Sequence, residues 1–106
     1  MTVHAWWVKS QILPLFEQGK CLEIRTAVPF FAGIITGDIL VLNSRLRRQM
    51  SAIRRYDSFE SMLDEEEPDQ IFPGKNADEV EGLLRSIYTR EQERRGVIVF
   101  ELLKVA

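Results

Sequence analysis

A lysine, a glutamate and an arginine lie close together in one short segment, and they are the residues best suited to chemistry. Residues 19–25 read GKCLEIR, which places Lys20, Glu23 and Arg25 at K-x-x-E-x-R spacing. Lysine and arginine hold phosphates or carbonyls, and an ionised glutamate accepts the exocyclic amine of cytosine or adenine. The set therefore suits recognition of a nucleobase. The alternative is that Glu23 and Arg25, which are two positions apart and so share one face of a strand, form a surface ion pair worth less than about 1 kcal/mol.

The same segment holds the candidates for catalysis, with Lys20 as base or nucleophile activator and Glu23 positioning water or an amine. A catalytic lysine needs a pKa lowered by burial or by neighbouring cations, and a nearby glutamate opposes this. Binding is therefore the easier role. Strict strand alternation places Lys20 on the face of Leu22. The turn that Gly19 permits lets the lysine side chain reach the opposite face, where Glu23 lies.

Arginines farther along the chain and one tryptophan are further candidates for nucleic-acid contacts. The arginine-rich residues 45–55 offer Arg45, Arg47 and Arg54 as a stripe that follows phosphates, or alternatively as a solvated strand face. Trp6 can stack on a base, although an aromatic residue in a small protein is more often part of the core. His4 suits a structural hydrogen bond better than catalysis.

The formal charge of −2 hides a strong asymmetry along the chain. Residues 1–55 carry eight basic and three acidic side chains, about +5, whereas residues 56–106 carry six basic and thirteen acidic ones, about −7. The acidic residues 64–67 lack the spacing of a calcium loop and fit a solvated helix end. A nucleic-acid partner is therefore expected to meet the N-terminal half.

Common enzyme and cofactor signatures are absent from the sequence. It has no phosphate-binding glycine-rich loop, no His-Glu-x-x-His and no G-x-S-x-G motif. One cysteine and one histidine exclude an internal disulfide and a Cys/His zinc site, so no cofactor or metal is expected. No leader pattern or long apolar run is present, which predicts a cytoplasmic protein without a membrane segment.

The hydrophobic pattern predicts one α+β domain over residues 1–106. Strands are expected at residues 3–8, 21–26, 39–42, 45–55 and 97–105, and helices at 10–19, 58–63 and 76–88, with a last helical turn at 89–95. A small closed barrel of about five or six strands with three or four short flanking helices would hide the strand edges.

Local signals indicate where these elements begin and end. Ser10 is expected to cap the first helix, and Asp57 or Ser58 the second. The Asn43-Ser44 pair predicts a hairpin turn, and broken alternation predicts a β-bulge near Ala52. Capping-box spacing occurs at Asp57 with Glu60, Asn76 with Glu79, and Thr89 with Gln92.

The order and spacing of several short stretches resemble the ASCH domain family, named for homology to the activating signal cointegrator, within the PUA-like superfamily of small β-barrels. The resemblance covers nearly the whole chain. It rests on the K-x-x-E-x-R core, Gly37-Asp38 before an apolar strand, YDSF at residues 56–59 before Met62-Leu63, Pro73-Gly74, LRSIY at residues 84–88, and Glu93 followed by Gly96-Val97.

This resemblance implies a barrel whose cleft is floored by Lys20, Glu23 and Arg25, with RNA or a nucleotide as the ligand. Some related small proteins are amidohydrolases acting on 4-acetylcytidine, in which the lysine activates a threonine three residues later. Glu23 occupies that position here. Hydrolysis of acylated nucleosides, or a weak ribonuclease activity, is therefore the alternative function.

A protein-interaction module is the third function class. Residues 27–35 are apolar where relatives of this family tend to be polar, so Phe30 and Phe31 are expected to pack on the barrel or to form a contact surface. The chain is expected to be a monomer or a weak homodimer without membrane contact.

Overall fold

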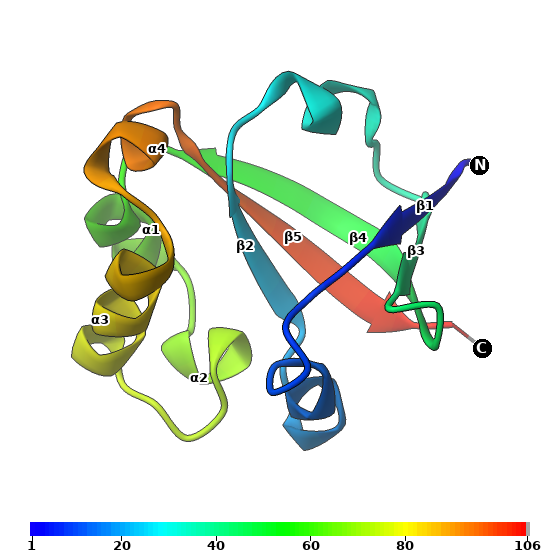
Figure 1. The fold of residues 1–106 in the computed structure, drawn as a ribbon, viewed down its shortest axis with the longest axis horizontal. Helices are drawn as coiled ribbons and strands as arrows, with labels where there is room; N and C mark the ends of the chain where they lie inside the picture. Colours follow the sequence, from blue (N-terminus) through cyan, green and yellow to red (C-terminus); the bar gives the residue numbers. More distant parts are fainter. Residues whose placement is uncertain (106) are drawn as a thin grey trace.

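Five strands form one curled sheet with short helices around it (Figure 1). The structure is a computed structural model that describes residues 1–105. In chain order its elements, with η for a 3₁₀-helix, are β1 (Val3–Trp6), η1 (Leu13–Gln18), β2 (Leu22–Thr26), η2 (Pro29–Gly33), β3 (Ile39–Leu42), β4 (Leu46–Tyr56), α1 (Phe59–Glu65), α2 (Pro68–Ile71), α3 (Ala77–Ile87), α4 (Arg90–Arg94) and β5 (Val97–Lys104). The α+β class is as predicted. Among residues 1–105, no helix has the length and apolar character needed to cross a bilayer.

The strand order in the sheet is β1-β3-β4-β5-β2. Strands β1 and β3 are parallel, and every other neighbouring pair is antiparallel. The C-terminal strand β5 lies between β4 and β2, which confirms the prediction that it is central (Figure 1). The expected closure of the sheet is not made, because β1 and β2 remain edge strands. They have only four and five residues, and η1 and η2 instead cover the concave side by inserting Phe16 and Phe31 into its core.

Two separate hydrophobic cores lie on the two faces of the sheet. Strand β5 alternates between them, since Ile98 and Phe100 face the concave core while Val97 and Val99 face the helices. The concave core contains Trp6, Phe16, Phe31, Ile34, Leu40, Leu42, Met50, Ile98, Phe100 and Leu102. On the other face, α1, α2 and α3 cover Leu22, Ile24, Val97 and Val99 with Phe59, Met62, Ile71, Phe72, Val80 and Leu84.

Strand β4 contributes to both cores because its alternation changes near its middle. The β3–β4 hairpin turns at Asn43 and Ser44, whose φ angles of 52° and 57° match the predicted hairpin. A register shift between Met50 and Ala52 confirms the predicted bulge. Met50 and Leu102 face the concave core before the shift, whereas beyond it Arg54 pairs in register with Val99 on the helix side.

The expected caps of the first two helices have different outcomes. The first helix is a 3₁₀-helix that follows Ile12 without a side-chain cap, so Ser10 caps nothing, although Gly19 ends the helix at φ 110° as expected. Helix α1 is capped by Ser58, one of the two expected residues, with Ser61 as reciprocal partner. The capping box expected at Asp57 with Glu60 is wrong, because the helix begins one residue later than that box requires. The boxes of α3 and α4 at Asn76–Glu79 and Thr89–Gln92 are confirmed.

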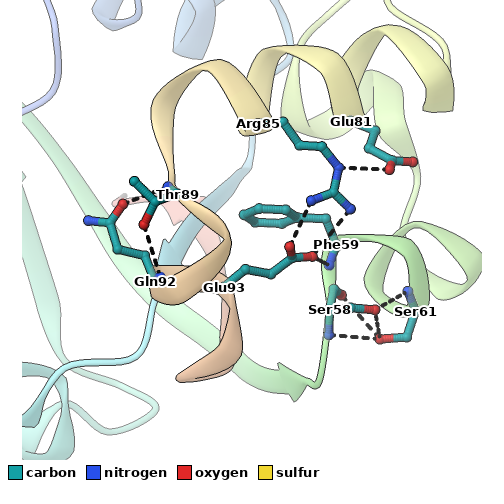
Figure 2. A network of polar contacts seen from close by, with 8 residues as sticks. All are labelled: Ser58, Phe59, Ser61, Glu81, Arg85, Thr89, Gln92 and Glu93. Atoms are coloured by element: carbon teal, nitrogen blue, oxygen red, sulfur yellow. Dashed lines mark hydrogen bonds and ion pairs between the residues drawn. The ribbon is translucent and has the colours of Figure 1, made fainter.

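A buried glutamate joins the beginning of α1 to α3 and α4. Glu93 accepts a hydrogen bond from Phe59 N at 2.9 Å and one from Arg85 Nη1 at 2.7 Å (Figure 2). Arg85 also donates to Glu81 at 3.0 Å, and its guanidinium lies 5.6 Å from the Phe59 ring centroid. One carboxylate therefore holds three helices in a fixed arrangement over the sheet.

Replacing Glu93 by alanine is expected to lower the free energy of unfolding by about 1–3 kcal/mol, because Phe59 N–H and Arg85 lose a buried acceptor. Urea denaturation followed by circular dichroism measures this change. Glu91→Ala, at an exposed position of the same helix, is the matched control and should change stability by less than about 0.5 kcal/mol. Equal effects of the two substitutions would contradict the role of Glu93.

Asp38 joins the N-terminal strand to the beginning of β3. Its buried carboxylate accepts hydrogen bonds from Thr2 N and Ile35 N, both at 3.1 Å, and lies 2.8 Å from His4 Nε2. The hydrogen bond with His4, followed by those with the two backbone groups, lowers the pKa of Asp38 from 3.8 to about 2. His4 thus has the structural role expected from the sequence.

The lowered pKa of Asp38 predicts a specific acid dependence of stability. Between about pH 4 and pH 2 the carboxyl group of Asp38 is protonated in the unfolded chain but still ionised in the folded chain. The stabilisation that Asp38 gives to the folded state is therefore complete above pH 4 and is lost as the pH falls toward 2. Thermal unfolding across this range should show a shallower fall for Asp38→Asn than for the wild type. Asp64→Asn, at an exposed position of α1, should keep the wild-type slope. A wild-type slope for Asp38→Asn would refute the assignment.

Candidate functional site

A cavity of about 240 Å³ lies at the outer edge of β2. We call it the β2 cavity. It is bounded by β2, by the residues that follow β1, and by α2 and α3. Its lining is mainly apolar with a few polar groups, and consists of Trp7, Val8, Lys9, Ile12, Lys20, Glu23, Ile24, Arg25, Ile71, Phe72, Leu84, Ile87 and Tyr88. All three residues of the K-x-x-E-x-R segment therefore meet at one concave site.

Lys20 lies almost completely buried at the bottom of this site. The left-handed turn at Gly19 directs the chain so that Lys20 Nζ donates to Leu22 O at 2.7 Å and to Ile71 O at 2.8 Å. It also lies 3.3 Å from Glu23 Oε1. These three acceptors match the three protons of an ammonium group, so the lysine connects β2 to α2.

Burial is the main influence on the pKa of Lys20. Desolvation lowers it below the usual value of 10.5, while the charge and hydrogen bond of Glu23 act in the opposite direction. The centroids of the Phe72 and Phe16 rings lie 5.1 and 5.5 Å from the ammonium nitrogen, so both rings form cation–π contacts with it. A charged lysine in this position is held by its partners rather than free to react.

Glu23 is placed between two cations. Its Oε1 faces Lys20, and its Oε2 accepts a hydrogen bond from Arg25 Nη2 at 2.8 Å. In β2 both Glu23 and Arg25 are in register with concave-core residues of β5, as the alternation predicted. The side chain of Arg25 is 24% exposed, and its Nη2 also approaches Trp7 O at 3.4 Å. Its remaining N–H groups are available to a ligand.

The outer edge of β2 is closed by side chains rather than by another strand. Lys20 binds the carbonyl of Leu22, and Tyr88 Oη donates to the carbonyl of Ile24 at 3.1 Å. Burial raises the pKa of Tyr88, so its hydroxyl stays a donor. The cavity therefore has a fixed polar end, formed by this edge, and an apolar remainder.

Two solved structures are similar to this chain over nearly its whole length. The crystal structure of hypothetical protein PH0355 has a TM-score of 0.88 and 28% identity, and the match covers 99% of this chain and 100% of that one. The solution NMR structure of protein PF0455 from Pyrococcus furiosus has a TM-score of 0.79 and 28% identity, with 95% and 96% covered. No protein-family model and no curated protein matches the chain. The chain therefore shares its fold with these two proteins.

The two neighbouring tryptophans have opposite environments. Trp6 is 4% exposed and packs against Phe31 and Phe100, with the Arg25 guanidinium 5.0 Å from its ring. The expectation that Trp6 stacks on a base is therefore wrong, because core side chains and Arg25 cover its faces. Trp7 is 68% exposed and lines the β2 cavity. The sequence placed two tryptophans here but gave no signal for which one the strand would turn outward.

The arginine stripe does not form beside the β2 cavity. Arg54 is bound to Glu66 through bonds of 2.6 and 2.8 Å and to Glu101 at 2.9 Å. Arg45 and Arg47 are exposed, and neither lines this cavity. Glu66 is itself buried, so the expectation of a wholly solvated acidic segment at residues 64–67 is wrong at this position.

The two phenylalanines of the apolar residues 27–35 lie in different environments. Phe31 is buried in the concave core, whereas Phe30 is 64% exposed and contacts it edge-on. In the part of the chain that the structure describes, no three His, Cys, Asp or Glu side chains gather as a metal site. Tyr88 and the Ile71 carbonyl were missed as site groups, because only the fold brings them next to β2.

Substituting Lys20 by methionine is expected to lower the free energy of unfolding by roughly 3 kcal/mol, as for a broken buried ion pair. The change removes the donor to two carbonyls and one partner of Glu23. Chemical denaturation measures it, and Lys9→Met serves as control because Lys9 is an exposed lysine of the same cavity. Wild-type stability of Lys20→Met would show that the buried ammonium does not connect β2 to α2.

Proposed function

We propose that this chain is an ASCH-like protein of the PUA-like superfamily that binds RNA or a nucleotide, with one base in the β2 cavity. The observation that carries the proposal is the Glu23 carboxylate fixed between Lys20 and Arg25 at the polar end of an otherwise apolar cavity. A carboxylate held in this way accepts an exocyclic amine, and the free N–H groups of Arg25 reach a ring carbonyl or a phosphate.

The size of the cavity supports a ligand part no larger than a nucleoside. Pockets for drug-sized molecules span roughly 300–1,000 Å³. The β2 cavity, at about 240 Å³, lies below this range. Its apolar side, with Trp7 at the opening, suits the flat face of a base.

Charge around the cavity favours an anionic ligand. Lys9, Lys20 and Arg25 line it together with the single carboxylate of Glu23. Three cations against one anion leave an excess of positive charge in a protein whose net charge is −2. Such an excess attracts phosphate, and the attraction weakens as salt is added.

Binding is better supported than hydrolysis. The amidohydrolase alternative needs a lysine able to activate a nucleophile, but each proton of Lys20 already faces an acceptor, and Glu23 stands where a threonine is needed. Incubation with 4-acetylcytidine distinguishes the two functions. Release of cytidine by the wild type, and not by a folded Glu23→Gln variant, would overturn a role limited to binding.

Arg25→Met is expected to weaken binding of a nucleoside monophosphate by about tenfold or more. The reason is that a hydrogen bond to a charged group contributes roughly 1.5–3 kcal/mol, and about 1.4 kcal/mol corresponds to a tenfold change in affinity. Titration calorimetry with cytidine and adenosine 5′-monophosphates, at two salt concentrations, measures this loss and the salt dependence of the wild type. Arg25 is substituted rather than Lys20, because Lys20 also stabilises the fold.

The control is Arg47→Met, which removes an exposed arginine outside the cavity and should leave affinity unchanged. The melting temperature of each variant is recorded to separate loss of binding from loss of fold. Absence of binding by the folded wild type, or equal affinity of wild type and Arg25→Met, would refute the proposed function.

A further inference from the structure

A second cavity of about 510 Å³ adjoins the first. We call it the η1 cavity. It is formed by the segment after β1, by η1 and by the β3–β4 turn, and its lining residues are Trp7, Ser10, Leu13, Pro14, Glu17, Asn43, Arg45 and Leu46. Trp7 is the residue that also lines the β2 cavity, so one exposed indole borders both.

The backbone next to Trp7 is held in place from both sides. Asn43 accepts a hydrogen bond from Val8 N at 2.8 Å and donates one to Val8 O at 2.9 Å. Asn43 N also donates to the carbonyl of Trp6 at 2.9 Å, and on the other side Arg25 Nη2 approaches the carbonyl of Trp7 at 3.4 Å. Trp7 is 68% exposed, so its indole offers a stacking surface whose backbone needs no further ordering when a ligand binds.

A cation without an anionic partner lies in each cavity. Among residues 1–105, Lys9 in the β2 cavity and Arg45 in the η1 cavity form no ion pair, whereas Arg25, Arg48, Arg54 and Arg85 each do. Glu17, the acidic residue of the η1 cavity, faces Arg48 at 3.5 Å. Positive charge is therefore available on both sides of Trp7.

We propose that the ligand is a single-stranded oligonucleotide that places two successive nucleotides on the two sides of Trp7. One base enters the β2 cavity and its neighbour enters the η1 cavity, with Lys9 and Arg45 reaching the phosphates. This inference rests on the proposed function and adds to it, because a free mononucleotide would leave the η1 cavity and Arg45 unused.

The experiment compares a nucleoside 5′-monophosphate with the 5′-phosphorylated dinucleotide of the same base, using whichever of cytosine and adenine the wild type binds more tightly. The dinucleotide is expected to bind about tenfold or more tightly, since stacking of one further base is worth about that factor. Arg45→Met should reduce this advantage and leave monophosphate affinity unchanged. Trp7→Ala should weaken both ligands, with Trp7→Phe restoring most of the loss.

Arg47→Met is the matched control, since it removes an exposed arginine outside both cavities and should change neither affinity. Equal affinity for the two ligands, or an Arg45→Met variant that weakens both alike, would overturn the two-nucleotide arrangement and leave the proposed function standing. Failure of the folded wild type to bind either ligand would overturn the proposed function, and this inference with it.

Discussion

Strand β2 is the last strand on one side of the sheet, and the carbonyl groups that it turns away from β5 have no strand to bind them. Burying such a group without a donor costs free energy comparable to a lost hydrogen bond. The chain satisfies two of these carbonyls with side chains, using Lys20 for Leu22 and Tyr88 for Ile24. Both donors also line the β2 cavity, which lies along this edge. The polar end of the site is thus formed by the side chains that satisfy the outer carbonyls of β2.

The acidic half of the chain is organised by two buried carboxylates at the ends of α1. Glu93 receives the first amide of the helix together with Arg85, and Glu66, at the C-cap of the helix, binds Arg54 on β4. A helix of seven residues has little stability of its own, because it forms few internal hydrogen bonds. Contacts at its two ends provide the stability that a longer helix would gain from its own hydrogen bonds. The negative charge of these helices is therefore partly structural, whereas Lys9 and Arg45, on the two sides of Trp7, form no ion pair among residues 1–105.

Local patterns predicted most elements, because alternation, turns and capping boxes depend on residues close in the chain. The pairing of Glu23 with Arg25 on one face, the turn at Asn43 and the bulge near Ala52 are of this kind. The remaining features depend on distant partners. The second carbonyl that binds Lys20 belongs to Ile71, and the partner of Arg54 is Glu66, so neither could be read from alternation. Barrel closure failed as an expectation for the same reason, since Phe16 and Phe31 fill the concave side from 3₁₀-helices.

The bulge in β4 makes the number of residues in that strand as informative as their chemical types. Ile53 packs on the concave core and Arg54 points to the helices only because one extra residue lies between Met50 and Ala52. Deleting Ser51 would remove the bulge and join Met50 directly to Ala52, and the pairs on either side would keep their register, so Ile53 and Arg54 would stay on their present faces. A strand of the same length without a bulge would instead carry Arg54 into the apolar interior, and Glu66 would lose its partner. The extra residue therefore reconciles two halves of β4 whose alternation is one residue out of step.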